Sequence, residues 1–233
     1  MCGRYQLNKI PREIREWFPP SWRWRFPGGL VPRFNIAPST EALVVRTREG
    51  KPVGEMLTWG FRPHWMQQKS KNQINARAET LFDTRMFASA ARWQRCLVIA
   101  DGFYEPAGKT QPRPWYRFHF DDEHQFTMAG IWTSWGRAAE RHESFAIVTT
   151  AADSVVCRIH ERMPLLIDES NRAAWLDPRT PREDVDALCV SQAASGLRCD
   201  RVSDYVKNPR NEGPACIAPV EDPGPLQRDW PHC

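Results

Sequence analysis

Four short apolar segments in the middle of the chain restrict its fold more than any other feature of the sequence. They are rich in β-branched and aromatic residues, and they cover residues 96–100, 115–120, 126–133 and 145–150. Successive strands of this kind, with turn-forming stretches between them, are typical of a mostly antiparallel sheet. Residues 121–125 are predicted to be a hairpin connection. In 115–120 the side chains alternate strictly, so the face that carries Arg117 and His119 is expected to meet solvent or a ligand.

Short helices and a further hairpin are predicted around this sheet. The strands of the hairpin are residues 42–46 and 53–59, and a last strand covers 164–167. Apolar spacing and composition predict helices at 10–18, 79–94, 169–176 and 181–189. No repeat or linker divides these elements. We therefore expect one α+β domain over residues 1–220, followed by a proline-rich tail, 221–233, that is irregular.

Composition and charge exclude several classes of protein. The formal net charge is only +4, which is too small for a polycation but allows an anionic partner if the arginines gather on one face. No apolar run is long enough to span a membrane, and the first residues carry no secretory signal, so we expect a cytoplasmic protein with no membrane contact. In that compartment all seven cysteines are expected to be free thiols.

The sequence contains no recognised motif for binding a metal or a cofactor. No two cysteines are spaced as a metal knuckle or a redox dithiol requires. The chain also lacks a glycine-rich phosphate loop, an H-E-x-x-H motif and a G-x-S-x-G motif. We therefore expect no metal and no cofactor, and neither nucleotide hydrolysis nor metalloprotease activity.

Cys2 is the residue with the most specific chemistry. Removal of Met1 leaves a terminal cysteine, in which an α-amine and a thiol sit on adjacent carbons. The amine has an ordinary pKa of ~7.7–8, so a neutral fraction exists at neutral pH and can form a Schiff base with an aldehyde. The thiol can then close onto the imine carbon and give a five-membered thiazolidine. A structural role for Cys2 remains open on this observation alone.

Three further motifs place polar residues where chemistry is feasible. In Asn75–Thr80 an amide and the guanidinium of Arg77 are expected on the same side of an extended segment, where they suit a chain terminus and a phosphate. Glu105 follows an aromatic pair, and apolar surroundings raise the pKa of a carboxyl group. His160 is a candidate acid or base, and Trp59 and Trp65 lie in a loop where an exposed ring can stack on unpaired bases. Each of these residues is also compatible with an ordinary surface or structural role.

Six blocks of sequence, taken in order, resemble one known family. They are MCGRY at the N-terminus, RFNIAPST (33–40), WGFRPHW (59–65), INARAET (74–80), RCLVIADGFYE (95–105) and FAIVTTAAD with IHERMP (145–164). This order resembles the SRAP family of SOS response-associated peptidases, or abasic-site processing proteins. The resemblance implies an α+β fold with a barrel-like antiparallel sheet flanked by short helices. It also implies a positively charged groove for single-stranded DNA and a Cys2 thiazolidine with the ring-opened aldehyde of an abasic site.

The resemblance also implies roles for individual residues. Four serve the covalent chemistry: Cys2 as nucleophile, Asn75 to orient the terminus, Glu105 for acid/base and sugar-hydroxyl contacts, and His160 for Schiff-base chemistry. Six contact DNA: Arg4, Arg77 and Arg162 at the phosphates, and Pro38, Trp65 and Met66 as a wedge between bases. The partner is then single-stranded DNA with abasic sites, including single-strand/duplex junctions, and we expect a monomer that associates with the nucleoid when it is bound to DNA.

Two other functions remain open from the sequence. A freed Cys2 beside an acid or base is also the arrangement of an N-terminal-nucleophile thiol peptidase, and autoproteolysis limited to Met1 is compatible with both functions. The tryptophans and arginines alone are compatible with a module that binds single-stranded DNA without covalent chemistry. An abasic-site enzyme is further expected to have weak lyase activity when the thiol is missing.

Overall fold

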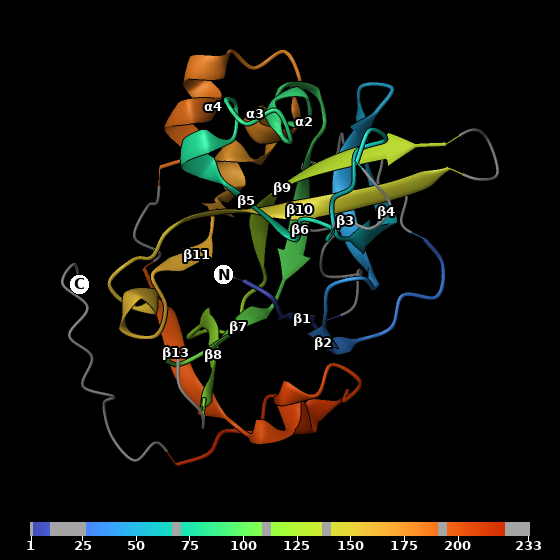
Figure 1. Cartoon of the computed structure of the whole chain (residues 1–233). Helices are drawn as coiled ribbons and strands as arrows, with labels where there is room; N and C mark the ends of the chain where they lie inside the picture. Colours follow the sequence, from blue (N-terminus) through green and yellow to red (C-terminus); the bar gives the residue numbers. More distant parts are fainter. Residues whose placement is uncertain are drawn as a thin grey trace.

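The computed structural model describes residues 2–9, 27–66, 71–108, 113–136, 141–190 and 195–221. The helix predicted at 10–18 and most of the tail predicted at 221–233 lie outside these residues. Within them the chain forms two β-sheets with short helices at their edges (Figure 1). This is the single α+β domain with a barrel-like core that the sequence and the family resemblance predicted.

The larger sheet closes into a barrel in the described part of the chain. Five strands form the ring in the order β10-β4-β3-β6-β9, and β9 pairs back with β10. All of these pairs are antiparallel except β10 with β4. The strands of the ring are β3 (Glu41–Arg48), β4 (Lys51–Trp59), β6 (Arg95–Ala100), β9 (Phe126–Trp135) and β10 (His142–Ala151).

Three short strands extend the barrel. β5 (Asn75–Arg77) runs parallel to β10, and β11 (Arg162–Pro164) pairs with the end of β10. β12 (Leu166–Ile167) pairs with β9. The chain therefore brings β5 and β11, which are far apart in sequence, to the same end of β10.

A cluster of ion pairs around Arg46 lies at one end of the barrel. The side chain of Arg46 is fully buried, its guanidinium donates to Glu55 and to Glu143 (2.6 Å), and it stacks 4.0 Å from the ring of Trp132. A buried guanidinium requires such partners because an unpaired charge in the interior is strongly destabilising.

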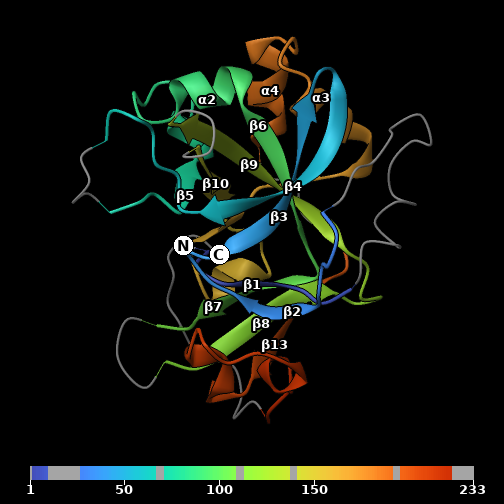
Figure 2. The same ribbon diagram turned by 90° about the vertical axis from the view of Figure 1, so that its right-hand side faces the viewer.

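The second sheet carries the beginning of the chain. Its order is β13-β8-β7-β1-β2, so β1 is a central strand between β7 and β2. Figure 2 shows this sheet as a lower layer, with the N-terminus between it and the barrel. Its strands are β1 (Tyr5–Leu7), β2 (Arg33–Ile36), β7 (Gly102–Pro106), β8 (Trp115–Phe120) and β13 (Leu197–Val202).

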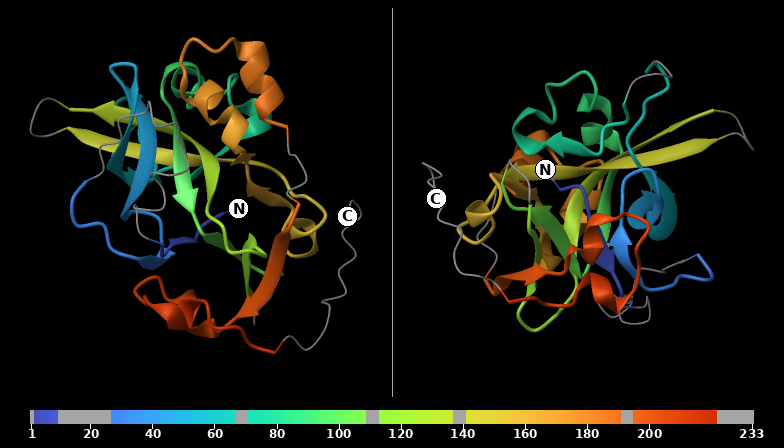
Figure 3. Two further views of the ribbon diagram at one scale, coloured as in Figure 1. Left: turned by 180° about the vertical axis from the view of Figure 1, so that it is seen from behind. Right: turned by 60° about the horizontal axis from the view of Figure 1, so that its bottom comes forward.

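Short helices cover the edges of the two sheets. α2 (Ala88–Trp93), α3 (Arg172–Leu176) and α4 (Arg182–Leu188) lie together beside the barrel, at the opposite end of the molecule from the residue 203–217 segment (Figure 3). The remaining helical turns of the described chain are η2 (Ala78–Thr80), η4 (Val156–Arg158), η5 (Glu169–Asn171), η6 (Asp204–Lys207) and η7 (Pro214–Cys216). No helix of the described residues is long and apolar enough to cross a membrane.

The predicted strands are confirmed, and several finer predictions are wrong. Only Ala88–Trp93 of the helix predicted at 79–94 is α-helical. Residues 121–125 link the two sheets instead of closing a hairpin, because β8 and β9 belong to different sheets. The predicted strand at 164–167 is divided between β11 and β12.

The alternation in β8 was also interpreted wrongly. Arg117 and His119 are as buried as the aromatic residues between them. Arg117 forms an ion pair with Glu123 at 2.6 Å, and Nε2 of His119 lies 2.7 Å from the Asp200 carboxylate. These partners come from the turn after β8 and from β13, so both faces of the strand are covered.

One of the six cysteines among the described residues differs from expectation. Cys2, Cys96, Cys189, Cys199 and Cys216 are free thiols. Cys157 is disulfide-bonded, so the prediction of seven free thiols is wrong there.

Candidate functional site

Hydrogen bonds from both sheets hold the main chain at residue 2 and just after it. The carbonyl of Arg4 accepts a hydrogen bond from the Tyr104 N–H (2.9 Å), and the carbonyl of Gln6 accepts one from the Asp101 N–H (2.9 Å). From the other sheet, Nδ2 of Asn75 donates to the carbonyl of Cys2 (2.8 Å). Asn75 lies on β5, at the end of the barrel that faces β1, so the two sheets meet at the first residues of the chain.

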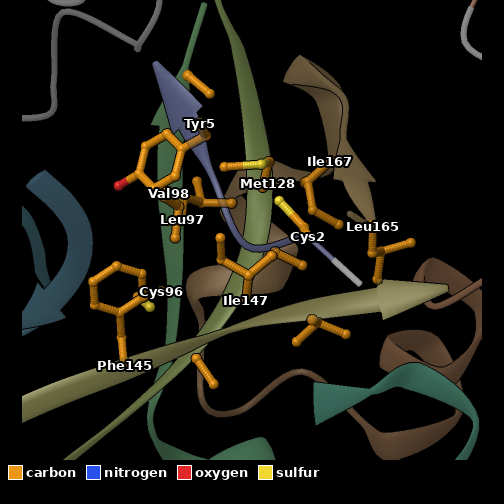
Figure 4. Packing of buried hydrophobic residues seen from close by; sticks show 14 of the residues in the cluster. Cys2, Tyr5, Cys96, Leu97, Val98, Met128, Phe145, Ile147, Leu165 and Ile167 are labelled. Atoms are coloured by element: carbon orange, nitrogen blue, oxygen red, sulfur yellow. The ribbon is translucent and has the colours of Figure 1, made fainter. Parts of the chain in front are cut away.

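The Cys2 side chain lies in the hydrophobic core. Its exposed fraction is 0%, and its sulfur lies near Met128 and Ile167 (Figure 4). The nearest polar contact is the carbonyl of Arg4, 3.9 Å from Sγ. Burial raises the pKa of the Cys2 thiol far above its usual range, and the negative charge of Glu105 raises it further. With Met1 present the thiol is therefore protonated at neutral pH.

Glu105 provides a carboxyl group with a pKa near neutrality. It lies on β7 and is only 1% exposed. Burial raises the pKa of Glu105 to about 7, although the positive charges of the chain N-terminus and of Arg113 act in the opposite direction. A carboxyl group with this pKa is present in both protonation states at neutral pH, so it can donate or accept a proton.

His160 has one ring nitrogen committed to the backbone. The N–H of Arg162 donates to Nδ1 of His160 (3.0 Å). Nδ1 also lies 3.1 Å from the Arg162 carbonyl, which can only accept, so the two contacts hold the ring against β11 without fixing which nitrogen carries the proton. Burial lowers the pKa of His160, and the positive N-terminus lowers it further, which favours the neutral ring.

The structure gathers the four residues predicted to be catalytic around the chain terminus. Asn75 contacts Cys2 directly, the charge of Glu105 acts on the Cys2 thiol, and the N-terminal ammonium acts on both Glu105 and His160. Their roles in a reaction stay predictions.

Two of the three arginines predicted to bind phosphate lie near this cluster. Arg77 ends β5 and is exposed, with no hydrogen bond or ion pair from its side chain to the described residues. Arg162 on β11 is 12% exposed and is paired with Glu79. Thr149 of β10 pairs with Arg77 in the sheet register, and its carbonyl accepts from Arg162 (2.6 Å), so both arginines lie beside the same strand.

Arg4 has a different environment. It is 8% exposed, and its Nη1 donates to Oδ1 of Asn35 (2.7 Å) and to the carbonyl of Val206 (2.7 Å). Its guanidinium also lies 5.4 Å from the ring of Trp115. These contacts tie β1 to the segment around η6, and a phosphate contact of Arg4 stays a prediction.

The predicted wedge residues occupy two loops. Pro38 is half-buried in the turn between β2 and β3. Trp65 is 43% exposed, and the guanidinium of Arg85 lies 5.2 Å from its ring. Met66 is half-buried in the same turn as Trp65. Trp59, by contrast, is fully buried, so the prediction of an exposed ring there is wrong.

Two charged residues of this region were missed in the sequence. Arg113 lowers the pKa of both Glu105 and His160, but it lies between prolines in a segment with no recognisable pattern. Glu79 belongs to the Asn75–Thr80 motif and was the easier one to find, because it is a carboxylate two positions after Arg77.

Comparison with known proteins identifies the family of the chain. The family described as SOS response associated peptidase (SRAP) matches residues 1–209. The chain belongs to the SRAP family. Among its SRAP relatives, the abasic site processing protein YoqW of Bacillus subtilis is 29% identical over 93% of this chain and 99% of its own length. The abasic site processing protein YedK of Escherichia coli is 28% identical over 94% of this chain and 100% of its own.

More distant similarity extends to animals and to solved structures. The abasic site processing protein HMCES of Rattus norvegicus is 26% identical, over 95% of this chain and 76% of its own length. A crystal structure of a Bacteroides thetaiotaomicron protein superposes with a TM-score of 0.80, covering 94% of this chain and 100% of the other, at 20% identity. At that identity the structure shows a shared SRAP fold and nothing further.

Proposed function

We propose that this SRAP protein processes abasic sites in single-stranded DNA by forming a covalent bond through Cys2 after Met1 is removed. One observation supports this most directly: the main chain at Cys2 is held by Asn75, next to a carboxyl group with a pKa of about 7. The relatives named as abasic site processing proteins, which match over nearly the whole chain, point to the same lesion.

The proposed reaction proceeds in two balanced steps. The neutral α-amine of Cys2 attacks the aldehyde carbon of the ring-opened sugar, and loss of water gives an imine. The thiol sulfur then adds to the imine carbon, its proton is transferred to the nitrogen, and a thiazolidine results. No oxidant, metal or cofactor takes part. The ring closure withdraws the imine from β-elimination, which otherwise cleaves the strand.

Glu105 and His160 supply the proton transfers of this scheme. A protonated Glu105 can donate to the ring oxygen of the closed sugar and promote opening, and the resulting carboxylate can accept a proton from the attacking amine. His160, whose pKa is lowered by burial, is proposed to transfer a proton to or from a substrate oxygen as a neutral imidazole. The same two groups allow slow reversal.

The DNA strand is proposed to pass beside β5 and β11. Arg77 is exposed there, and Arg162 lies on β11, which pairs with the same strand β10, so we propose that a guanidinium is available to phosphates on both sides of the lesion. The exposed ring of Trp65, with Pro38 and Met66, is proposed to separate the adjacent bases, which suits single strands and single-strand/duplex junctions. We propose that the protein acts as a cytoplasmic monomer on this DNA.

A limited peptidase activity is the second candidate. The charge of Glu105 acts on the Cys2 thiol, so a proton-transfer group is available near Cys2. The thiol of Cys2 is 0% exposed, which favours self-processing of Met1 over cleavage of other proteins.

A denaturing gel tests the proposed function. The protein is incubated with a single-stranded oligonucleotide that carries one abasic site, and its mass is measured beforehand to establish loss of Met1. We expect a heat-stable shifted band with the wild type and with Cys189→Ala, which removes another free thiol. Cys2→Ala is expected to give no such band and to retain weak strand cleavage. Absence of the band with wild-type protein that has lost Met1 would contradict the proposal.

A further inference from the structure

The carboxylate of Glu79 occupies the position on Arg162 that suits a phosphate. Nη1 of Arg162 donates to Oε1 of Glu79 (2.5 Å) and Nη2 donates to Oε2 (2.9 Å). This is a bidentate pair, the same geometry in which a guanidinium binds a phosphate. In the DNA-free protein the Nη1–Nη2 edge of Arg162 is therefore already taken.

The remaining donors of Arg162 do not offer a second edge of this kind. Nη2 also donates to the carbonyl of Thr149 (2.6 Å), which uses its other proton. Nε is buried and has no hydrogen-bond partner among the described residues. A phosphate that binds Arg162 through two oxygens must consequently replace Glu79.

The two partners differ in how easily they can move. The side chain of Arg162 is 12% exposed and is held against β10 by Thr149, whereas the side chain of Glu79 is 50% exposed. The carboxylate can therefore turn into water while the guanidinium stays in place. Because the phosphate makes the same bidentate contact and the displaced carboxylate is rehydrated, the exchange has a small cost.

The charge around this pair keeps Glu79 ionised. The hydrogen bonds from Arg162 lower the pKa of Glu79, and the charge of the nearby Arg77 lowers it further. Two arginines and one carboxylate thus form a group beside Asn75, which holds Cys2. The carboxylate repels any phosphate that approaches Arg77 or Arg162 until it is displaced.

We propose that Glu79 is an affinity-setting residue that competes with DNA phosphate for Arg162. This inference rests on the proposed function, since it concerns the strand that lies beside β5 and β11. Its consequence is that undamaged single strands dissociate readily, and stable attachment depends on the covalent bond at Cys2. Glu79 then determines selectivity for the lesion without contacting it.

The test measures non-covalent binding to a single-stranded oligonucleotide without a lesion, by fluorescence anisotropy at several salt concentrations. Glu79→Gln is expected to tighten binding about two- to fivefold. It should also steepen the plot of log affinity against log salt by about 0.7, the value for one additional phosphate contact on a single strand.

Asp83→Asn provides the matched control. It removes the same charge from a nearby turn, where Asp83 pairs with Arg182 at 3.1 Å. This variant is expected to change affinity less than Glu79→Gln and to leave the salt slope as in the wild type. In an Arg162→Gln background, Glu79→Gln should have no larger effect than Asp83→Asn.

Three results overturn the inference. Weaker binding by Glu79→Gln shows that the carboxylate positions Arg162 for DNA, and equal effects of Glu79→Gln and Asp83→Asn show that only net charge matters. The crosslinking gel with abasic DNA is run on the same preparations. If Glu79→Gln crosslinks normally and its affinity for undamaged DNA is unchanged, the role of Glu79 is rejected and the proposed function stands. If the wild type does not crosslink, the proposed function is rejected.

Discussion

The buried carboxyl group of Glu105 should make the stability of the protein depend on pH in a defined interval. Its pKa rises from an ordinary 4.5 to about 7 in the folded protein, mainly through burial. Between these values the folded state binds more protons than the unfolded state, so the free energy of unfolding falls as pH rises. The stabilisation is complete below pH 4.5, is lost as the pH rises to about 7, and does not decrease further above that.

The size of this effect follows from the same interval. At 1.36 kcal/mol per pH unit, the change from 4.5 to about 7 corresponds to about 3 kcal/mol. Glu105→Gln replaces the carboxyl group by a neutral group of similar shape and removes this contribution. The variant is therefore expected to match the wild type near pH 4.5 and to exceed it in stability by up to about 3 kcal/mol above pH 7.

Urea denaturation at half-unit intervals from pH 4.5 to 8 measures the difference directly. Glu183→Gln, a substitution on the exposed face of α4, serves as the control and should keep the pH dependence of the wild type. Parallel curves for the wild type and Glu105→Gln would refute the reasoning about burial. In the crosslinking assay the same variant should react more slowly with unchanged DNA affinity, and a normal rate would show that Glu105 is only structural.

Two further variants separate phosphate contacts from internal ones. Arg77→Ala should weaken binding to single-stranded DNA and reduce the salt slope by ~0.7, since the exposed guanidinium is free to bind one phosphate; an unchanged slope removes Arg77 from the interface. Arg4→Met should lower the free energy of unfolding by about 2–4 kcal/mol, because Asn35 and the Val206 carbonyl lose a charged donor. Its salt slope should stay as in the wild type, and a reduced slope would establish a phosphate contact of Arg4.

The strands could be predicted because their signal is local. The segments that form β6, β8, β9 and β10 are apolar, short and separated by turns, and no distant partner is needed to recognise them. The closure of the barrel depends on pairs between distant strands, above all β9 with β10 on one side and β10 with β4 on the other. Only the family resemblance indicated this closure.

The wrong predictions share a cause, which is tertiary contact. Residues 79–94 have a helical composition, but Leu81, Phe82 and Phe87 are all buried in the core, and turns replace the first half of the helix. Arg117 and His119 are buried because Glu123 and Asp200 cover them, and the sequence gives no sign of these partners. Local propensity cannot show which distant residue will neutralise a charge.

The residues of the candidate site could be predicted from the sequence, but their pKa shifts could not. Cys2 attracts attention by its position alone, and Asn75, Glu105 and His160 lie in motifs that the resemblance covers. The pKa of about 7 at Glu105 depends on burial between the two sheets, which follows from the assembled fold.

Because Cys2 is buried, removal of Met1 is expected to change the reactivity of its thiol as well as to create its free amine. In the chain that retains Met1, the thiol is fully buried and burial raises its pKa, so it is a poor nucleophile at neutral pH. Removal of Met1 places the α-ammonium on Cys2 itself, and a positive charge on the nitrogen of the adjacent carbon favours the thiolate. The hydrogen bond from Asn75 to the Cys2 carbonyl does not involve Met1, so it can hold the terminus in register after cleavage. The same event therefore creates the amine that forms the imine, and until the imine forms the ammonium lowers the pKa of the neighbouring thiol.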